Sequence, residues 1–205
     1  MASSPRFAPI ITGFQPFGSH RVNPSRDAAE AMAEALQAPF HCLPVTFAAA
    51  SQFARDHLRA DPTSPFLFLH LGLAADREHL SFEFRARNRR DATPDNLEKT
   101  RPLNLPSSQD LLPGEREARC TYLNLTALLN SYEEHRSPDL PVGQISRDCG
   151  AYVCNAIFYH SLRASEVTRA QGRQSSALFI HIPAMEVDQA RHLGTCLARV
   201  ITTLL

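Results

Sequence analysis

The sequence FLFLHLGL, at residues 66–73, decides the fold of this chain. A strand with one face in water alternates apolar and polar residues, whereas this run is apolar at almost every position. A nearly continuous apolar run is typical of a central parallel strand that is covered on both faces. It therefore predicts a sheet buried between two layers of helices.

Strand-like and helix-like segments alternate along the rest of the chain. Apolar or alternating runs predict strands at 7–14, 40–47, 81–88, 142–146 and 178–182. Helical spacing predicts helices at 24–37, 48–60, 122–134, from about Cys154 onward, and at 185–205. Residues 89–119, rich in Pro, Asn, Ser and charge, are predicted to be a long loop. This order favours an α/β fold: a three-layer α/β/α sandwich around a mostly parallel, twisted sheet, in a single domain of residues 1–205.

The composition excludes several classes of partner and location. Lys plus Arg and Asp plus Glu number 21 each, so neither nucleic acid nor an anionic membrane is expected as a partner. No apolar run approaches the length of a membrane span, and the N-terminal MASSPRFAPI lacks a secretory apolar region. Five cysteines, an odd number without paired spacing, indicate reduced thiols and a cytoplasmic location.

The stretch QISRDCGAYVCNAIFYHSL, at residues 144–162, contains the first candidate for chemistry. Cys154, Phe158 and Leu162 are four residues apart, which indicates a helix with an apolar side. Asp148 is the expected N-cap of this helix. A cysteine in the first turns lies at the positive end of the helix dipole, which favours the thiolate. The alternative is a structural cysteine, because free cysteines are among the most buried residues.

A histidine and a glutamate could complete a cysteine hydrolase with Cys154. His181 interrupts an apolar strand just before Pro183 and is the best candidate base; the alternative is a core histidine bonded to backbone. Glu83 could orient the imidazole, as the third group of a triad does. The alternative for Glu83 is a surface carboxylate paired with Arg85 or Arg87.

In an open α/β sheet, sites form outside the carboxyl ends of the strands. The loop at 14–18, the turn at 72–76, the start of the Cys154 helix and His181 all lie near predicted strand ends. The topology therefore predicts that they converge.

Several separated stretches together resemble the pyroglutamyl peptidase I family of cysteine peptidases. They are TGFQPFG at 12–18 with NPS at 23–25, CGAYVCN at 149–155 and FIHIP at 179–183, and, between them, GLA at 72–74, SFE at 81–83, ARN at 86–88 and PDN at 94–96. The order and spacing of these motifs also fit, so the resemblance covers nearly the whole chain.

The resemblance implies a reaction and roles for particular residues. Cys154 is then the nucleophile, His181 the general base and later acid, and Glu83 the residue that orients His181. The substrate-binding residues that it implies are Phe14, Phe17, Leu73 and Val153, with the two phenylalanine rings against the lactam of the substrate. For these rings the alternative is a purely structural place in the core.

The implied reaction removes pyroglutamate (5-oxoproline) from the N-terminus of a peptide through a thioester acyl-enzyme. Backbone N–H groups near the helix start are expected to hold the oxyanion. The family needs no metal and no cofactor, and its partners are peptides with an N-terminal pyroglutamate. A homo-oligomer is compatible with the resemblance, because the family is often tetrameric.

The chain departs from the family pattern mainly around Glu83. Ala75-Asp76 stands where the family usually has two glycines, and Phe84-Arg85 reverses the family's order of a basic and then an apolar residue. Arg85 would then either pair with Glu83 or mark a rearranged strand end.

Two further positions differ. A family arginine near the substrate has no clear counterpart, and Arg89 or Arg90 could replace it. Cys149 stands where the family more often has a small residue other than cysteine. These departures leave a second hypothesis, a diverged member that binds small molecules or peptide N-termini with weak or no hydrolysis.

Overall fold

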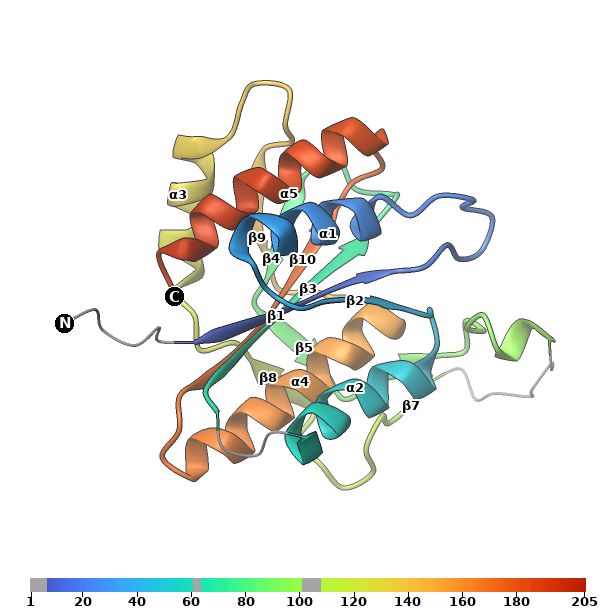
Figure 1. The fold of residues 1–205 in the computed structure, drawn as a ribbon. Coiled ribbons are helices and arrows are strands. Elements are labelled where there is room, and N and C mark those ends of the chain that lie inside the picture. Colours follow the sequence, from blue (N-terminus) through green and yellow to red (C-terminus); the bar gives the residue numbers. More distant parts are fainter. Residues whose placement is uncertain (1–6, 61–63, 101–107) are drawn as a thin grey trace.

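The computed structural model describes residues 7–60, 64–100 and 108–205. Its centre is a six-stranded sheet with the strand order β2-β1-β3-β10-β4-β9 (Figure 1). These strands are β1 (Ala8–Phe14), β2 (Phe40–Leu43), β3 (Phe66–Leu73), β4 (Leu80–Glu83), β9 (Gly143–Ser146) and β10 (Ser175–Ile182). The central strands β3 and β10 are buried along their whole length, as the apolar sequence of β3 predicts.

Most of the sheet is parallel. β2, β1, β3 and β10 pair in parallel with one another. β4 pairs antiparallel with β10, and β9 pairs parallel with β4. The predicted mostly parallel sheet is confirmed, and two strands at one side of it run against the others.

Helices cover both faces of the sheet (Figure 1). One face carries α1 (Pro24–Leu36), α3 (Leu125–His135) and α5 (Val187–Thr202), and the other carries α2 (Phe47–Ala60) and α4 (Val153–Ala170). Within the layers, α5 packs on both α1 and α3, and α2 packs on α4. The predicted three-layer sandwich is confirmed. Among the residues described, no helix combines the length and apolarity needed to cross a bilayer.

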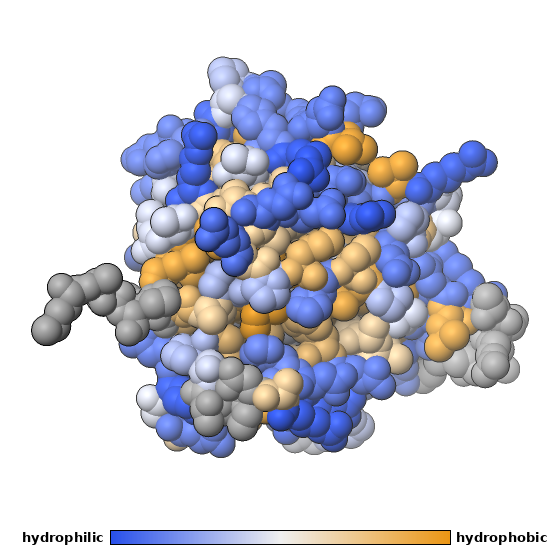
Figure 2. Space-filling model, viewed as in Figure 1, coloured by the Kyte–Doolittle hydropathy of each residue, from blue (hydrophilic) through white to orange (hydrophobic). Residues whose placement is uncertain are grey.

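The edge of the sheet is less well covered than its centre. β2 is the edge strand beside β1, and its residues are only partly buried. Figure 2 shows a band of apolar side chains between the two hydrophilic helical layers. The apolar interior of the sandwich therefore reaches the surface on this side of the molecule.

The predicted strand at 81–88 is wrong as a single element. β4 ends at Glu83, and β5 (Arg85–Arg87) belongs to a separate small sheet. The chain turns out of the main sheet at Phe84, whose N–H donates to the carbonyl of Ser146 at 2.7 Å. Apolar and polar residues keep alternating across this break, so the pattern alone could not reveal it.

Part of the predicted loop at 89–119 forms short elements. They are β6 (Arg90–Asp91), which pairs with β7 (Ser108–Gln109), the 3-10 turn η1 (Glu98–Thr100), and β8 (Ala118–Cys120), which pairs with β5. Residues 101–107 of that predicted loop lie outside the described residues. Described parts of this segment pack against α4, since both β6 and β8 contact this helix.

Side-chain caps shift two element boundaries. The strand predicted at 40–47 stops before Pro44, which has no N–H for a sheet ladder. α2 begins at Phe47, whose N–H donates to a carboxylate oxygen of Asp95 at 2.8 Å. α3 begins later than predicted, because Asn124 caps it by accepting from the N–H of Ala127 at 3.1 Å.

A histidine in the middle of β3 is structural. His70 is fully buried, and its two ring nitrogens bond to the hydroxyls of Thr12 at 2.8 Å and Ser161 at 2.9 Å. Burial lowers the pKa of His70 to about 3, so the ring is neutral at physiological pH. A polar residue in this apolar strand therefore needs no functional explanation.

The close packing of α1 on α5 gives a prediction for stability. A Cβ at Gly194 of α5 would overlap the backbone carbonyl of Ala28 in α1. We expect Gly194→Ala to lower the free energy of unfolding by about 1–3 kcal/mol, as overpacking of a core does. Thr195→Ala, at the exposed neighbouring position, should change it by no more than about 0.5 kcal/mol. Urea denaturation measures the free energy of unfolding of both variants. An equally small change in both would contradict the close contact of α1 with α5 at Gly194.

Candidate active site

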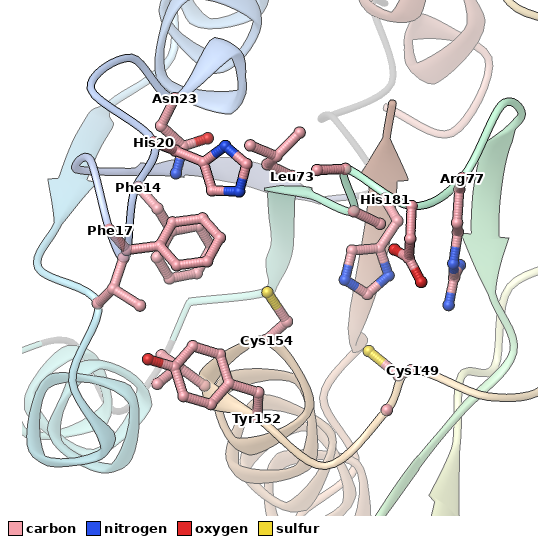
Figure 3. A pocket seen from close by; sticks show the side chains of 16 residues that line it. Phe14, Phe17, His20, Asn23, Leu73, Arg77, Cys149, Tyr152, Cys154 and His181 are labelled. Atoms are coloured by element: carbon pink, nitrogen blue, oxygen red, sulfur yellow. The ribbon is translucent and has the colours of Figure 1, made fainter. Parts of the chain in front are cut away.

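The strand ends that the sequence predicts to converge do lie together. A pocket of about 400 Å³ opens between the carboxyl ends of β1, β3 and β10 and the start of α4 (Figure 3). The predicted residues Phe14, Phe17, Leu73, Val153, Cys154 and His181 all line it. Glu83 lies behind His181 and contacts it from β4.

The pairing of β4 with β10 sets the position of Glu83 relative to His181. Glu83 lies opposite Phe179, and His181 is two residues further along β10, so all three side chains share one face of the sheet. Nδ1 of His181 is 2.8 Å from Oε1 of Glu83. Glu83 is 0% exposed and His181 is 5% exposed, so this contact is shielded from water. The alternative of a surface carboxylate at Glu83 is wrong.

An arginine that the sequence reasoning missed holds the same carboxylate. Arg77, in the turn after β3, donates from Nη1 to Oε1 of Glu83 at 2.6 Å. Its Nη2 donates to the carbonyl of Asp148 at 2.8 Å. Arg77 thus ties Glu83 to the loop before α4, and it also lines the pocket. The only signal in the sequence was a basic residue directly after Ala75-Asp76, beyond the end of a buried strand.

The arginines named from the sequence have other partners. Arg85 donates to the carbonyl of Arg147 at 2.9 Å, and Arg87 pairs with the carboxylate of Asp148 at 3.4 Å. Neither pairs with Glu83, because the chain leaves the main sheet at Phe84. Of the two readings of the Phe84-Arg85 reversal, the rearranged strand end is therefore the correct one.

Arg89 and Arg90 do not replace a substrate arginine. Neither lines the pocket. Arg90 pairs with Glu98 at 2.7 Å, and its guanidinium lies 3.7 Å from the ring centroid of Phe47. The arginine at the pocket is Arg77.

Cys154 is the second residue of α4, as expected of a helix-start cysteine. The N-cap is Tyr152, which makes no capping bond with its side chain, so the predicted cap at Asp148 is wrong. The Asp148 carboxylate instead accepts from the N–H of Gly150, a residue with φ of 77°. This bond closes a tight turn, and the helix therefore begins only at Val153, several residues after Asp148.

A glycine in β3 makes room for the thiol. A Cβ at Gly72 would lie 3.0 Å from Sγ of Cys154 and would overlap the ring of Phe179. A glycine at this strand end therefore allows the helix start, the β3 end and β10 to approach one another. Cys154 remains partly exposed, toward the pocket.

The electrostatics of the site oppose the expected resting thiolate. Burial, followed by the negative charge of Glu83, raises the pKa of Cys154 to about 12. Arg77 and the backbone N–H of Cys154 itself lower this pKa, but they do not outweigh burial. Burial also lowers the pKa of His181, although Glu83 opposes it. Both shifts favour a neutral thiol and a neutral imidazole in the resting pair, which is opposite to the direction expected from the helix dipole alone.

The other end of the pocket is lined mostly by apolar groups, together with His20 and Asn23 (Figure 3). Phe14 and Val153 are buried, and the ring centroids of Phe17 and Tyr152 lie 6.3 Å apart. The sequence reasoning missed Tyr152, whose hydroxyl donates to the carbonyl of Pro94 at 3.1 Å. This end of the pocket suits a small uncharged ring with few polar atoms.

The described residues include one group of side chains that could bind a metal ion. It consists of Glu83, Cys149 and His181, all buried, with possible ligand atoms within 4.8 Å of one another. Cys149 also lines the pocket.

The sequence matches the family model for pyroglutamyl peptidase over residues 9–199. The pyrrolidone-carboxylate peptidase of Thermococcus onnurineus strain NA1 is 30% identical over 178 residues, which cover 85% of this chain and 82% of that protein. The enzyme of the same name from Yersinia pestis strain Pestoides F is 30% identical over 190 residues, covering 90% of this chain and 82% of that protein.

Solved structures are similar over almost the full length. Pyroglutamyl peptidase I from Bacillus amyloliquefaciens has a TM-score of 0.74 and 24% identity, over 96% of this chain and 95% of that one. A variant of the pyrrolidone carboxyl peptidase of Pyrococcus furiosus has a TM-score of 0.72 and 26% identity, over 96% of this chain and 99% of that one. This chain belongs to the pyroglutamyl peptidase family.

Proposed function

We propose that this chain is a cysteine exopeptidase that removes pyroglutamate from the N-terminus of peptides. The observation that carries the proposal is the buried contact of Glu83 with His181 at a pocket that also presents the Cys154 thiol. The apolar, aromatic end of that pocket supports the lactam as the recognised group, because an unsubstituted lactam carries no charge. Family membership agrees with both.

The first half of the reaction forms a thioester. His181 takes the proton of the Cys154 thiol while the sulfur attacks the carbonyl carbon between pyroglutamate and the next residue. Glu83 stabilises the imidazolium that this transfer creates. The first N–H groups of α4 have no partner inside the helix, and we assign the oxyanion to them. The imidazolium then gives its proton to the leaving amine, and the C–N bond breaks.

The second half releases the acid. His181, neutral again, takes a proton from a water that attacks the thioester carbonyl. The C–S bond breaks, and the thiolate of Cys154 recovers its proton from the imidazolium. Every step is a proton transfer or an acyl transfer, so the residues described here suffice without a cofactor.

Arg77 affects these reaction steps through its contact with Glu83. It fixes the carboxylate by one hydrogen bond and the loop before α4 by another, so it positions both the partner of the base and the approach to the nucleophile. Its positive charge also lowers the pKa values of His181 and Cys154. We therefore assign Arg77 as a positioning residue.

The alternative is a diverged binder with weak or no hydrolysis. A binding module has no need of a thiol in the same pocket as an imidazole that is oriented by a buried carboxylate, so the geometry favours the enzyme. The proposed partners are peptides that begin with pyroglutamate. A cytoplasmic location and a homo-oligomer stay predictions; the five cysteines, all free, suit a reducing compartment.

The reaction and its nucleophile can be tested together. We expect the wild type to release a fluorophore from a pyroglutamyl amide, and Cys154→Ala to reduce kcat/KM at least about 1,000-fold, because it removes the attacking atom. The matching prolyl amide, which lacks the lactam carbonyl, should not be cleaved. No release by folded, reduced wild type would favour the binder instead.

The charge of Glu83 should affect both rate and pH dependence. Glu83→Gln keeps the side-chain shape but removes the charge that stabilises the imidazolium, so we expect kcat to fall about 10- to 1,000-fold. In the wild type the acid limb of kcat/KM should lie below pH 6.5, because burial lowers the pKa of His181 and the base must be neutral. Since Glu83 raises that pKa, Glu83→Gln should move the limb to still lower pH. If Glu83→Gln kept the wild-type kcat and the wild-type pH of the acid limb, Glu83 would have no role in the mechanism.

Arg77 should shift the same limb in the opposite direction. Its charge lowers the pKa of His181, so Arg77→Ala should raise the pH of the acid limb and lower kcat. Arg77→Lys keeps the positive charge but cannot make both hydrogen bonds, to Glu83 and to the carbonyl of Asp148. The acid limb should therefore stay near its wild-type pH, while kcat still falls. Arg85→Ala, which removes a nearby arginine bonded only to backbone, is the control and should behave as wild type. If Arg85→Ala moved the limb as far as Arg77→Ala, the effect would not belong to Arg77.

A further inference from the structure

We propose that Glu83, Cys149 and His181 form a zinc-binding site whose occupation withdraws the general base from catalysis. Their possible ligand atoms, a carboxylate oxygen, a sulfur and an imidazole nitrogen, lie within 4.8 Å of one another. The three residues come from β4, the loop before α4, and β10, so the fold and not a short motif brings them together.

The set of ligands matches the preferences of zinc. Zn²⁺ binds sulfur, imidazole nitrogen and carboxylate oxygen at about 2.0–2.3 Å, so two ligands of a tetrahedral site lie about 3.5 Å apart. The three atoms here lie within 4.8 Å of one another, so small side-chain rotations can bring them to that spacing. Two of the ligand residues, Cys149 and His181, line the pocket, which gives the ion a route of entry and leaves a fourth position for water.

One oxygen of Glu83 is available for this role. The imidazole and Arg77 both contact Oε1, whereas Oε2 is buried and has no hydrogen-bond partner among the described residues. A buried carboxylate oxygen without a partner is unfavourable, and a metal ion would satisfy it. Zinc on Oε2 leaves the ion pair of Glu83 with Arg77 in place.

Charge balance requires a proton to leave. The Cys149 thiol loses its proton to solvent as the Zn–S bond forms, and no group is oxidised or reduced. The negative charges of the thiolate and the carboxylate then equal the charge of the ion, and the nearby guanidinium of Arg77 leaves the group with one net positive charge.

Inhibition follows from the position of the ion. A metal-bound His181 and Glu83 cannot take the proton of the Cys154 thiol, so hydrolysis stops until a chelator removes the zinc. This consequence depends on the proposed function, whereas the binding itself does not. A general sensitivity of thiol enzymes to metals would act through Cys154, but here the required sulfur is that of Cys149.

The test is calorimetric titration of reduced, chelator-treated full-length protein with zinc sulfate. We expect one zinc per chain for the wild type and for Cys154→Ala, with affinities within about threefold of each other. Cys149→Ala should lose at least about 100-fold in affinity, more than an outer-shell partner of a metal contributes. Cys196→Ala removes another buried thiol, which packs in the core on the other face of the sheet, and should bind as wild type. Cys149→Ser, with a similar shape, serves if Cys149→Ala does not fold.

Two further readouts separate the possible outcomes. Cobalt(II) should give a thiolate-to-metal absorption band in wild type and Cys154→Ala but not in Cys149→Ala. In activity assays, with each protein compared with its own rate in chelator, zinc should inhibit wild type at concentrations at least about 100-fold lower than Cys149→Ala.

Loss of binding in Cys154→Ala but not in Cys149→Ala would overturn the site, as would the absence of stoichiometric binding to wild type. If wild type binds zinc in this way but cleaves no pyroglutamyl amide, the zinc site stands and the proposed function fails.

Discussion

The active site depends on the burial of one carboxylate, that of Glu83. An ionised group without solvent exposure must be compensated by partners, and Oε1 of Glu83 has two, Nδ1 of His181 and the guanidinium of Arg77. These partners come from β10 and from the turn after β3. They can meet only because β4 runs back antiparallel beside β10, which places Glu83 diagonally opposite His181. The reversed direction of β4, in a mostly parallel sheet, thus places Glu83 within reach of His181.

The same burial sets the state of the nucleophile. Burial of the thiol, followed by the negative charge of Glu83, raises the pKa of Cys154 and so favours the thiol over the thiolate. Burial also lowers the pKa of the His181 imidazole and so favours its neutral form, although Glu83 opposes this shift. In the proposed reaction, His181 takes the thiol proton as the sulfur attacks the substrate, and Glu83 stabilises the imidazolium that forms. A neutral pair is also less reactive toward chance electrophiles and oxidants than a permanent thiolate.

Sequence reasoning was reliable where local pattern determines structure. The apolar run of β3, the alternation of strands and helices and the positions of Cys154 and His181 at element ends all follow from the order of residues along the chain. It failed where the structure depends on contacts between segments that are distant in the sequence. The break at Phe84, the pairing of Glu83 with Arg77 rather than Arg85, and the cap at Tyr152 depend on strand register and on turns closed by side chains. Alternation of polar and apolar residues is the same whether a strand continues or moves into another sheet.

The departures from the family pattern lie mostly on one side of the site. Asp76 is close enough to His181 to raise its pKa, and Cys149 lies within 4.8 Å of both Glu83 and His181. The aromatic end of the pocket, with Phe14 and Phe17, follows the family motif instead. The departures expected from the sequence therefore lie closer to His181, the proposed base, than to the proposed lactam end of the pocket. Substitutions of that kind can alter how activity depends on pH or on bound metal ions, while the recognised group of the substrate stays the same.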